Sequence, residues 1–158
     1  MDFPTDTTER LQAAVDLAFR FISRRDRTES EVRLHLAKKG VEEGAIDHAV
    51  AELAEQGYLD DARYAQRFVE DRVTLDGWGS DRIERKLVEL GVPREHISTA
   101  LRGRDFGTEV DAALALLDRR WREPPQTDRE RERALGFLVR KGYDLEIAYD
   151  AIREHARR

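Results

Sequence analysis

Two adjacent carboxylates, Asp60 and Asp61, lie near the start of the stretch that most resembles a catalytic site, GYLDDARYAQRFVEDRV at residues 57–73. Asp60 and Asp61 could act as a carboxylate pair in acid–base catalysis, but such a site needs a positioned histidine or a metal, and none is near in sequence. At an N-cap, Asp60 would accept hydrogen bonds from the free amides of a helix's first turn, where the helix dipole also favours Asp61. Leu59 and Tyr64 have the spacing of a hydrophobic staple around that turn. We therefore interpret the two carboxylates as the start of a helix.

Other residue types give no stronger sign of catalysis. The histidines lack the spacing of metal ligands; they are His35, His48, His96 and His155. The chain has no cysteine, which excludes disulfides, thiol nucleophiles and thiolate metal sites. The glycine-containing GWGSDR at residues 77–82 lacks the lysine–serine end of a phosphate-binding loop. We expect no metal, no cofactor and no enzymatic activity.

Two tryptophans are candidates for binding. Trp121 lies among Arg119, Arg120 and Arg122, a combination that could grip phosphates and stack on a base. The alternative is that its ring ends a helix in the core while the arginines are solvated. Trp78, between two glycines, could anchor a partner or could fold back over its own module. The sequence leaves both questions open.

Charge is spread unevenly along this 158-residue chain of net charge −5. Residues 20–40 carry seven bases against three acids, residues 42–76 carry ten acids against three bases, and residues 114–142 carry eight bases against five acids. Basic ends around an acidic middle argue against a simple DNA coat. The polar N-terminus and the lack of an apolar run of ~18–20 residues predict a cytoplasmic protein.

The elements expected around these residues are all helices. Apolar residues recur at helical spacing, and strand-like alternation is short. Helices are predicted at 8–24, 29–39, 43–56, 61–75, 81–90, 94–102, 107–122, 128–141 and 145–156. Thr28 with Glu31, and Thr127 with Glu130, have the spacing of capping boxes at two of the helix starts.

The nine helices form three similar sets of three. Gly40, Gly91 and Gly142 are each 51 residues apart, where a left-handed glycine after a helix is common. Apolar residues occupy matching positions before each glycine, namely Val32, Ile83 and Ala134, then Leu36, Leu87 and Leu138. We predict three tandem modules at residues 1–57, 58–105 and 106–158. Because each is marginal alone, we expect them to stack into an elongated, curved array with function along an extended face.

The middle module carries a recognisable pattern. Residues 57–92 resemble the signature region of the RecX family of bacterial recombination regulators, and RTESEVRLHLAKKG at 27–40 resembles the family's first-module pattern. The matching positions are an aspartate pair, an aromatic–alanine helix, a glycine-containing loop, an arginine–isoleucine and a leucine before a glycine. They are Asp60, Asp61, Tyr64, Ala65, Phe68, Gly77, Gly79, Arg82, Ile83, Leu87 and Gly91.

This resemblance implies a non-enzymatic, RecA-binding regulator of DNA recombination, repair and the SOS response. Such proteins lie in the helical groove of the RecA filament on DNA and suppress its ATPase and strand exchange. We expect a monomer that contacts the RecA filament, and DNA directly or through it, with no membrane partner. The residues predicted to contact partners are Arg24, Arg25, Arg63, Arg67, Trp78, Arg119, Arg120, Arg122 and Lys141. The alternative is a helix-turn-helix-type DNA-binding protein that acts independently of RecA.

Overall fold

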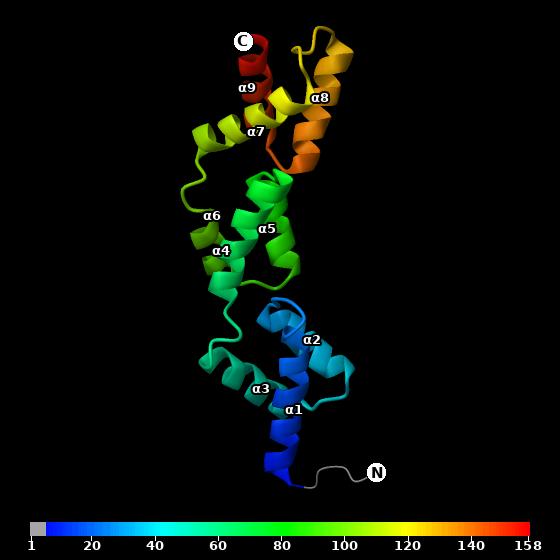
Figure 1. Cartoon of the computed structure of the whole chain (residues 1–158), viewed down its shortest axis with the longest axis vertical. Coiled ribbons are helices and arrows are strands. Elements are labelled where there is room, and N and C mark those ends of the chain that lie inside the picture. Colours follow the sequence, from blue (N-terminus) through cyan, green and yellow to red (C-terminus); the bar gives the residue numbers. More distant parts are fainter. Residues whose placement is uncertain (1–5) are drawn as a thin grey trace. The chain divides into compact units, whose positions relative to one another are not determined.

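A computed structural model describes residues 6–158, which contain nine α-helices, one π-helical turn and no strand (Figure 1). The elements are α1 (Thr7–Ile22), α2 (Glu29–Lys38), α3 (Glu43–Glu55), α4 (Asp61–Asp71), η1 (Arg72–Asp76), α5 (Ser80–Glu89), α6 (Arg94–Leu101), α7 (Phe106–Arg120), α8 (Asp128–Lys141) and α9 (Leu145–Ala156). The predicted all-helical fold of three tandem three-helix sets is confirmed. None of the helices in residues 6–158 has both the length and the apolar character needed to cross a membrane.

The chain packs into two compact units. Unit 1 comprises Met1–Ala65 and Val88–His96, and unit 2 comprises Gln66–Leu87 and Ile97–Arg158. Both unit boundaries fall inside the middle set of helices. The module limits 1–57, 58–105 and 106–158 stay a prediction, and these modules are numbered 1 to 3 below.

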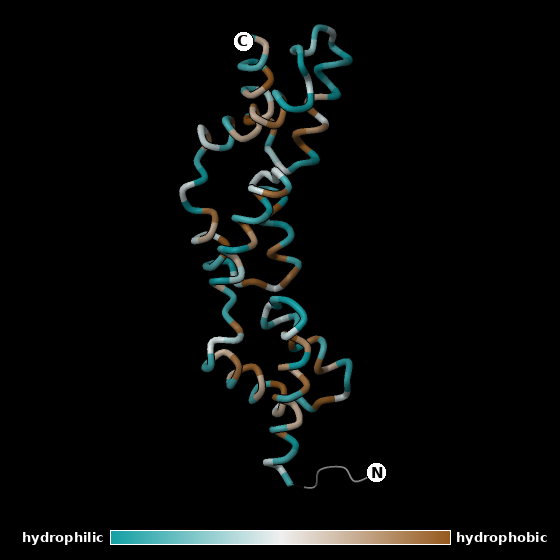
Figure 2. Tube along the Cα trace, in the orientation of Figure 1, coloured by the Kyte–Doolittle hydropathy of each residue, from teal (hydrophilic) through white to brown (hydrophobic). Residues whose placement is uncertain are grey.

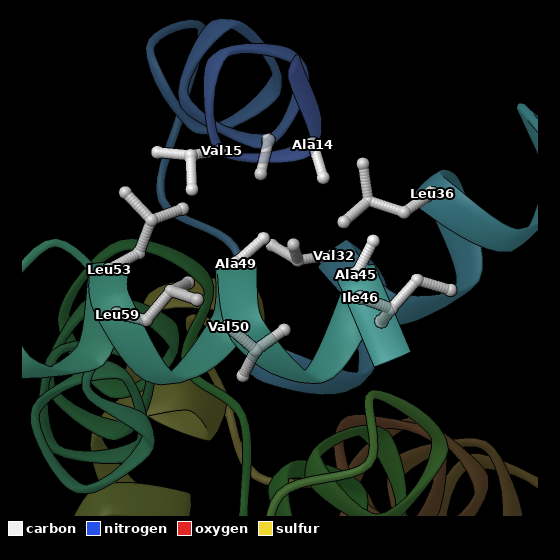
Figure 3. Close-up of a cluster of buried hydrophobic side chains, with 11 residues drawn as sticks. Ala14, Val15, Val32, Leu36, Ala45, Ile46, Ala49, Val50, Leu53 and Leu59 are labelled. Carbon is white, nitrogen blue, oxygen red and sulfur yellow. The ribbon is translucent and has the colours of Figure 1, made fainter. Parts of the chain in front are cut away.

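Unit 1 has its core between α1, α2 and α3. Apolar residues recur along each helix, as the hydropathy colouring in Figure 2 shows. In Figure 3, Ala14 and Val15 of α1 point toward Ala49 and Leu53 of α3. Val32 and Leu36 of α2 join the same cluster. Burial of this shared apolar stripe is what holds the three helices together.

Unit 2 has an equivalent core between α7, α8 and α9. Its fully buried members include Leu117 of α7, Leu138 of α8 and Ala148 of α9. Ile83 and Leu87 of α5 are also fully buried. The apolar positions that define the sequence repeat are therefore core positions.

The end of α4 differs from the continuous helix predicted over 61–75. The helix widens into the π-helical turn η1, which Gly77 closes in the left-handed conformation at φ 68°. The amide of Trp78 then donates to the carbonyl of Arg72 over 3.0 Å. Such turns are rare and occur mostly as single turns inside α-helices. Here the carbonyls of Asp76 and Gly77 accept hydrogen bonds from module 3, so sequence periodicity alone misses the change.

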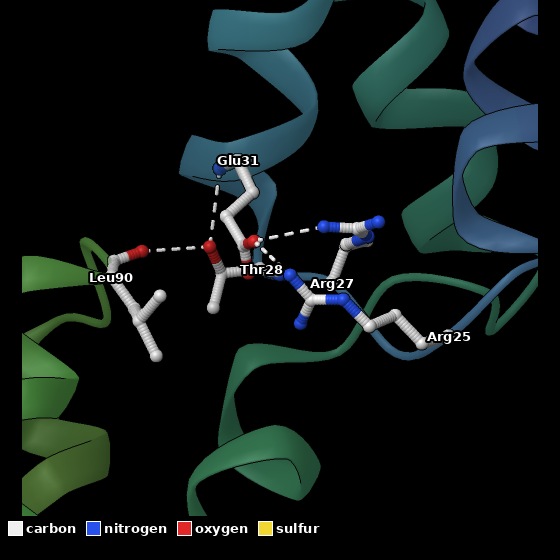
Figure 4. Close-up of polar contacts among 5 residues, drawn as sticks. All are labelled: Arg25, Arg27, Thr28, Glu31 and Leu90. Atoms are coloured by element: carbon white, nitrogen blue, oxygen red, sulfur yellow. Dashed lines mark hydrogen bonds and ion pairs between the residues drawn. The ribbon is translucent and has the colours of Figure 1, made fainter.

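The N-terminus of α2 is fixed to residues of the middle module that belong to unit 1, in what we call the first joint. Thr28, fully buried, caps α2 in a capping box with Glu31 and also donates its hydroxyl to the carbonyl of Leu90 over 2.7 Å (Figure 4). The amide of Glu29 donates to the Asp61 carboxylate over 3.0 Å. The Ser30 hydroxyl donates to the carbonyl of Gly91 over 3.3 Å.

The N-terminus of α5 is fixed in the same way within unit 2, in the second joint. The amide of Gly79 donates to the carbonyl of Lys141 over 2.8 Å, and that of Asp81 to the carbonyl of Gly142 over 3.1 Å. The amide of Ser80 donates to the carboxylate of Glu109 over 2.7 Å. These three donors lie 51 residues after Thr28, Glu29 and Ser30. One joint thus occurs twice at the period of the sequence repeat.

Contacts from module 3 reinforce the second joint. Lys141 donates its ammonium to the carbonyl of Asp76 over 2.9 Å, and the Tyr143 hydroxyl donates to the carbonyl of Gly77 over 3.0 Å. Burial raises the pKa of the Tyr143 phenol to about 12, so it stays protonated as a donor at neutral pH. The loop before α5 is therefore pinned at both its carbonyls and its amides.

Candidate partner-binding surfaces

The carboxylate pair at the start of α4 serves structure. Asp60 accepts the amide of Arg63 over 3.0 Å, which is the N-cap geometry that the sequence predicted. Asp61 is only 8% exposed and accepts the amide of Glu29. Burial raises the pKa of the Asp61 carboxyl, while its hydrogen bond from that amide and the nearby His96 act in the opposite direction. Both carboxylates that could have taken part in catalysis thus accept hydrogen bonds from amides at helix N-termini.

The four histidines lie in different surroundings. His35 stacks on Phe21, His48 pairs with Glu52, and His155 is buried beside Asp118. His96 lies near the charges of the first joint. Among the described residues, no three histidine, aspartate or glutamate side chains are grouped so that they could hold a metal ion.

A hollow that combines cations with aromatic rings lies between the end of α7 and α8; we call it the module 3 groove. It has a volume of about 380 Å³ and is lined by Arg120, Trp121, Glu132, Arg133, Gly136, Phe137 and Arg140. The Trp121 and Phe137 rings meet edge to face, with centroids 5.4 Å apart. The Arg120 guanidinium lies over both rings, 5.4 and 5.3 Å from their centroids. Trp121 is half-buried against the unit 2 core, so it has features of both alternatives that the sequence left open.

A second groove of this kind lies in unit 1 between α1 and α2; we call it the module 1 groove. It is lined by Leu17, Arg20, Phe21, Arg24, His35 and Lys39. The Phe21 and His35 rings are parallel, with centroids 3.9 Å apart, and the Arg27 guanidinium lies 4.1 Å from the centroid of Phe21. Desolvation lowers the pKa of His35, and the charges of Lys39, Arg27, Arg24 and Lys38 lower it further. The groove thus concentrates positive charge around the His35 ring.

The linings of the two grooves share one position of the repeat on their second helices. His35 and Phe137 are two 51-residue periods apart, as are Lys39 and Lys141. Modules 1 and 3 therefore each carry a ring on the second helix and a lysine at the end of that helix, at matching sites of the repeat. In the middle copy these sites carry Lys86 and Leu90, without a ring. Cations beside aromatic faces suit carboxylates, phosphates and stacked bases.

The structure brings some of the predicted contact residues together at these grooves. Arg24 lines the module 1 groove and Arg120 lines the module 3 groove. Lys141 lies 5.9 Å from the Phe137 ring while also bonding Asp76. Arg119 and Arg122 flank Arg120 and Trp121 in the chain and are exposed.

The other predicted contact residues lie away from the grooves. Arg25 is exposed and pairs with Glu31 over 3.5 Å. Arg63 donates to the carbonyl of Gly57 over 2.8 Å, which ties it to the turn before α4. Arg67 is exposed on α4 and also interacts within the chain. Trp78 folds back on its own module: its ring meets Phe68 edge to face with centroids 6.0 Å apart, and the Arg82 guanidinium lies 4.0 Å above it. Their roles in binding stay predictions.

Sequence reasoning missed the rings and cations supplied by the second helices. These are His35 and Lys39 in the module 1 groove, and Arg133, Phe137 and Arg140 in the module 3 groove. The 51-residue period was the signal that could have found them, since it relates His35 to Phe137.

Fold and surface together define a tandem three-helix repeat protein whose polar chemistry lies in open grooves. The chain matches the family descriptions RecX, first three-helix domain, at residues 14–53; second three-helix domain, at 60–101; and third three-helix domain, at 108–152. The chain belongs to the RecX family.

Named relatives support this assignment, and two solved structures share the fold. The chain is 33% identical over 143 residues to the regulatory protein RecX of Clostridium botulinum, a match that covers 88% of this chain and 66% of the relative. It is 31% identical over 151 residues to that of Amycolatopsis mediterranei, covering 94% and 86%. The fold resembles the crystal structure of RecX from Lactobacillus salivarius, with a TM-score of 0.82 at 19% identity, covering 96% and 99% of the two chains. A second crystal structure of regulatory protein RecX gives a TM-score of 0.77 at 23% identity, covering 94% of this chain and 73% of that one.

Proposed function

We propose that this chain is a non-enzymatic, monomeric, cytoplasmic regulator that binds the RecA filament on DNA and lowers its ATPase and strand-exchange activities. Family membership supports a regulatory role. The observation that carries the binding proposal is the pair of cationic, aromatic grooves in modules 1 and 3. A RecA–DNA filament offers acidic side chains and phosphates, both of which these grooves suit.

Two weak grooves on one chain also fit a polymeric partner. When one groove engages a subunit, the other is held near further subunits, so the second contact forms at high effective concentration. Neither groove then needs high affinity alone. The open form of both grooves is consistent with contacts of this kind rather than with capture of a small molecule.

The test is inhibition of RecA bound to single-stranded DNA with ATP, at amounts of this protein well below those of RecA. RecA from the matching host is used. We expect the parent chain to lower ATP hydrolysis, and no effect at any ratio would remove the proposal.

Variants then locate the contact. Replacing Arg119, Arg120 and Arg122 with glutamate should leave the fold intact, since all three are exposed, and weaken inhibition at least tenfold. The matched control makes the same charge change on α9 and the C-terminus, at the exposed Arg153, Arg157 and Arg158. Equal inhibition by both variants would remove the module 3 groove from the binding surface.

A second candidate is direct binding of duplex DNA by the basic module 3. The observation that favours it is the cluster of Arg120, Arg133, Arg140 and Lys141 around the Trp121 and Phe137 rings. Affinity for a duplex should then fall steeply with salt, with a slope that reports the number of phosphates contacted. No binding to a duplex at low salt, in the absence of RecA, excludes it.

A further inference from the structure

Each joint uses one acceptor face on the following module. In the first joint this face combines Asp61, four residues before the buried Ala65, with the turn at Gly91. In the second it combines Glu109, four residues before the buried Ala113, with the turn at Gly142. The carboxylate caps an arriving helix N-terminus, and the turn accepts its other donors. The acceptor face is thus a structural element of this repeat.

Module 1 has the turn of this acceptor face, but no module precedes it among the described residues. Gly40, the equivalent of Gly91 and Gly142, has the same left-handed backbone with φ of 83°, and a β-carbon built there would meet no atom within 4 Å. A hollow of about 470 Å³ lies at this turn, lined by Arg10, Ala13, Ala14, Leu17, Gly40, Val41, Glu42 and Ala45. Its lining is mainly apolar and carries one cation, Arg10, and one anion, Glu42.

The module 3 face shows what such a hollow can hold. At Gly77 a β-carbon would lie 2.7 Å from Leu116, and the Tyr143 hydroxyl bonds the Gly77 carbonyl. In the aligned helices, Leu116 corresponds to Leu17, since they lie three residues after Ala113 and Ala14. Tyr143 corresponds to Val41, since each follows its repeat glycine. The side chains that hold an incoming segment in module 3 therefore have counterparts that line the open hollow of module 1.

One position differs in charge. Four residues before the buried Ala14, where modules 2 and 3 carry Asp61 and Glu109, module 1 carries Arg10. A guanidinium repels the positive end of a helix and attracts a carboxylate or the carbonyls at a helix C-terminus. Arg10 also interacts within its own chain, so what matters for docking is the sign of the charge at this position.

We propose that this hollow docks a segment of a partner protein that presents an acidic side chain to Arg10 and an apolar side chain to Ala13, Leu17 and Val41. The segment takes the place that a preceding module takes in the two joints, with its charge reversed to match Arg10. If the proposed function holds, on which this identification of the partner rests, the segment belongs to RecA in the filament.

A second copy of the chain is a poor occupant by the same reasoning. The segment it would offer is the N-terminus of α8, which begins at Asp128. Its positive dipole end would face the guanidinium of Arg10. The charge reversal at Arg10 therefore favours an acidic partner over head-to-tail addition of copies.

Two substitutions in the full chain test the proposal by different means. Arg10→Glu reverses the charge and leaves the hollow open, whereas Ala13→Trp fills the hollow and leaves the charge. Ala13 is exposed, so the indole needs no core rearrangement. The matched control is Ala51→Trp, at an exposed alanine of α3 that does not line the hollow. Binding to RecA filaments is measured by cosedimentation, helix content by circular dichroism and self-association by sedimentation velocity.

We expect Arg10→Glu and Ala13→Trp each to weaken filament binding about tenfold, with helix content and Ala51→Trp unchanged. If both variants bind like the parent while the Arg119, Arg120 and Arg122 variant does not, this proposal is overturned and the proposed function stands. If the parent binds no filament, the proposed function itself fails. If the parent self-associates and Ala13→Trp abolishes that association, the occupant is a second copy and the proposal is again overturned.

Discussion

Removal of the Glu109 carboxylate should uncouple the second joint. Glu109 is 7% exposed and accepts the Ser80 amide over 2.7 Å. It also pairs with the Arg104 guanidinium over 3.4 Å, and the Arg104 side chain is only 12% exposed. Glu109→Ala therefore leaves a nearly buried cation without its partner and a helix-terminal amide without its acceptor.

The expected loss follows from those two costs. Breaking a buried pair by removing one partner costs about 3–5 kcal/mol, because the remaining charge stays desolvated. Loss of a helix cap alone costs only about 0.5–2 kcal/mol. The cation therefore dominates, and we expect a total near 4 kcal/mol, within the range for a buried pair. At a urea m-value of about 2 kcal/mol per molar, the midpoint of unit 2 falls by roughly 2 M.

Fluorescence suits this measurement because the chain has two tryptophans, Trp78 and Trp121, and both lie in unit 2. Urea unfolding followed by tryptophan emission thus reports unit 2, whereas far-ultraviolet circular dichroism reports both units. The matched control is Asp111→Ala, which removes an exposed carboxylate from the same helix and should change stability by less than about 0.5 kcal/mol.

A second substitution separates the buried charge from the cap. Adding Arg104→Met to Glu109→Ala removes the unpaired cation, so the double variant should recover about 1–3 kcal/mol relative to additivity. A Glu109→Ala midpoint within about 0.5 M of the parent, or strict additivity in the double variant, would refute the account of the joint.

Two further predictions concern the joints. Gly142→Ala should destabilise the chain by several kcal/mol, because its β-carbon would lie 2.4 Å from the Arg82 β-carbon and 2.8 Å from the Arg82 amide nitrogen. Gly40→Ala has open space around it, so it should cost only the strain of the left-handed backbone, about 1–2 kcal/mol. Equal losses in thermal melts of the two variants would show that the joint does not confine Gly142. Asp61→Asn keeps an acceptor but removes a carboxyl whose pKa burial raises above 3.8. Because the folded state holds that proton more tightly, this group's contribution to stability falls as pH rises from 3.8 through the raised pKa. In the variant this decrease in stability with rising pH should be absent, so the variant should be at least as stable as the parent at neutral pH. Circular dichroism melts across this range check it, and a variant clearly less stable at neutral pH contradicts it.

Local sequence patterns predicted the parts of the fold that local physics decides. The capping boxes at Thr28 and Thr127 are present, and the glycines of the repeat adopt the left-handed backbone. Ile83 and Leu87, chosen by the period of apolar residues, are fully buried. In each case the pattern itself spans only a few neighbouring positions, so a single stretch of sequence carries the signal.

The joints were not predictable from such patterns. Asp61 acts on Glu29 across 32 residues, and Glu109 acts on Ser80 across 29. Nothing near either carboxylate distinguishes a cap for a distant helix from a cap for its own. The loop around the π-helical turn is likewise held by distant residues, since Lys141 and Tyr143 donate to the carbonyls of Asp76 and Gly77.

The reach of these contacts also bears on synthesis of the chain at the ribosome. Thr28 finds its carbonyl acceptor at Leu90, which is translated 62 residues later. At about 5–20 residues per second, the nascent α2 waits about 3–12 s for that acceptor. The Tyr143 hydroxyl similarly arrives 66 residues after Gly77. Each module of the growing polypeptide therefore lacks part of its hydrogen bonds until the next module leaves the exit tunnel. Folding of the earlier module is then completed by contacts from the later one.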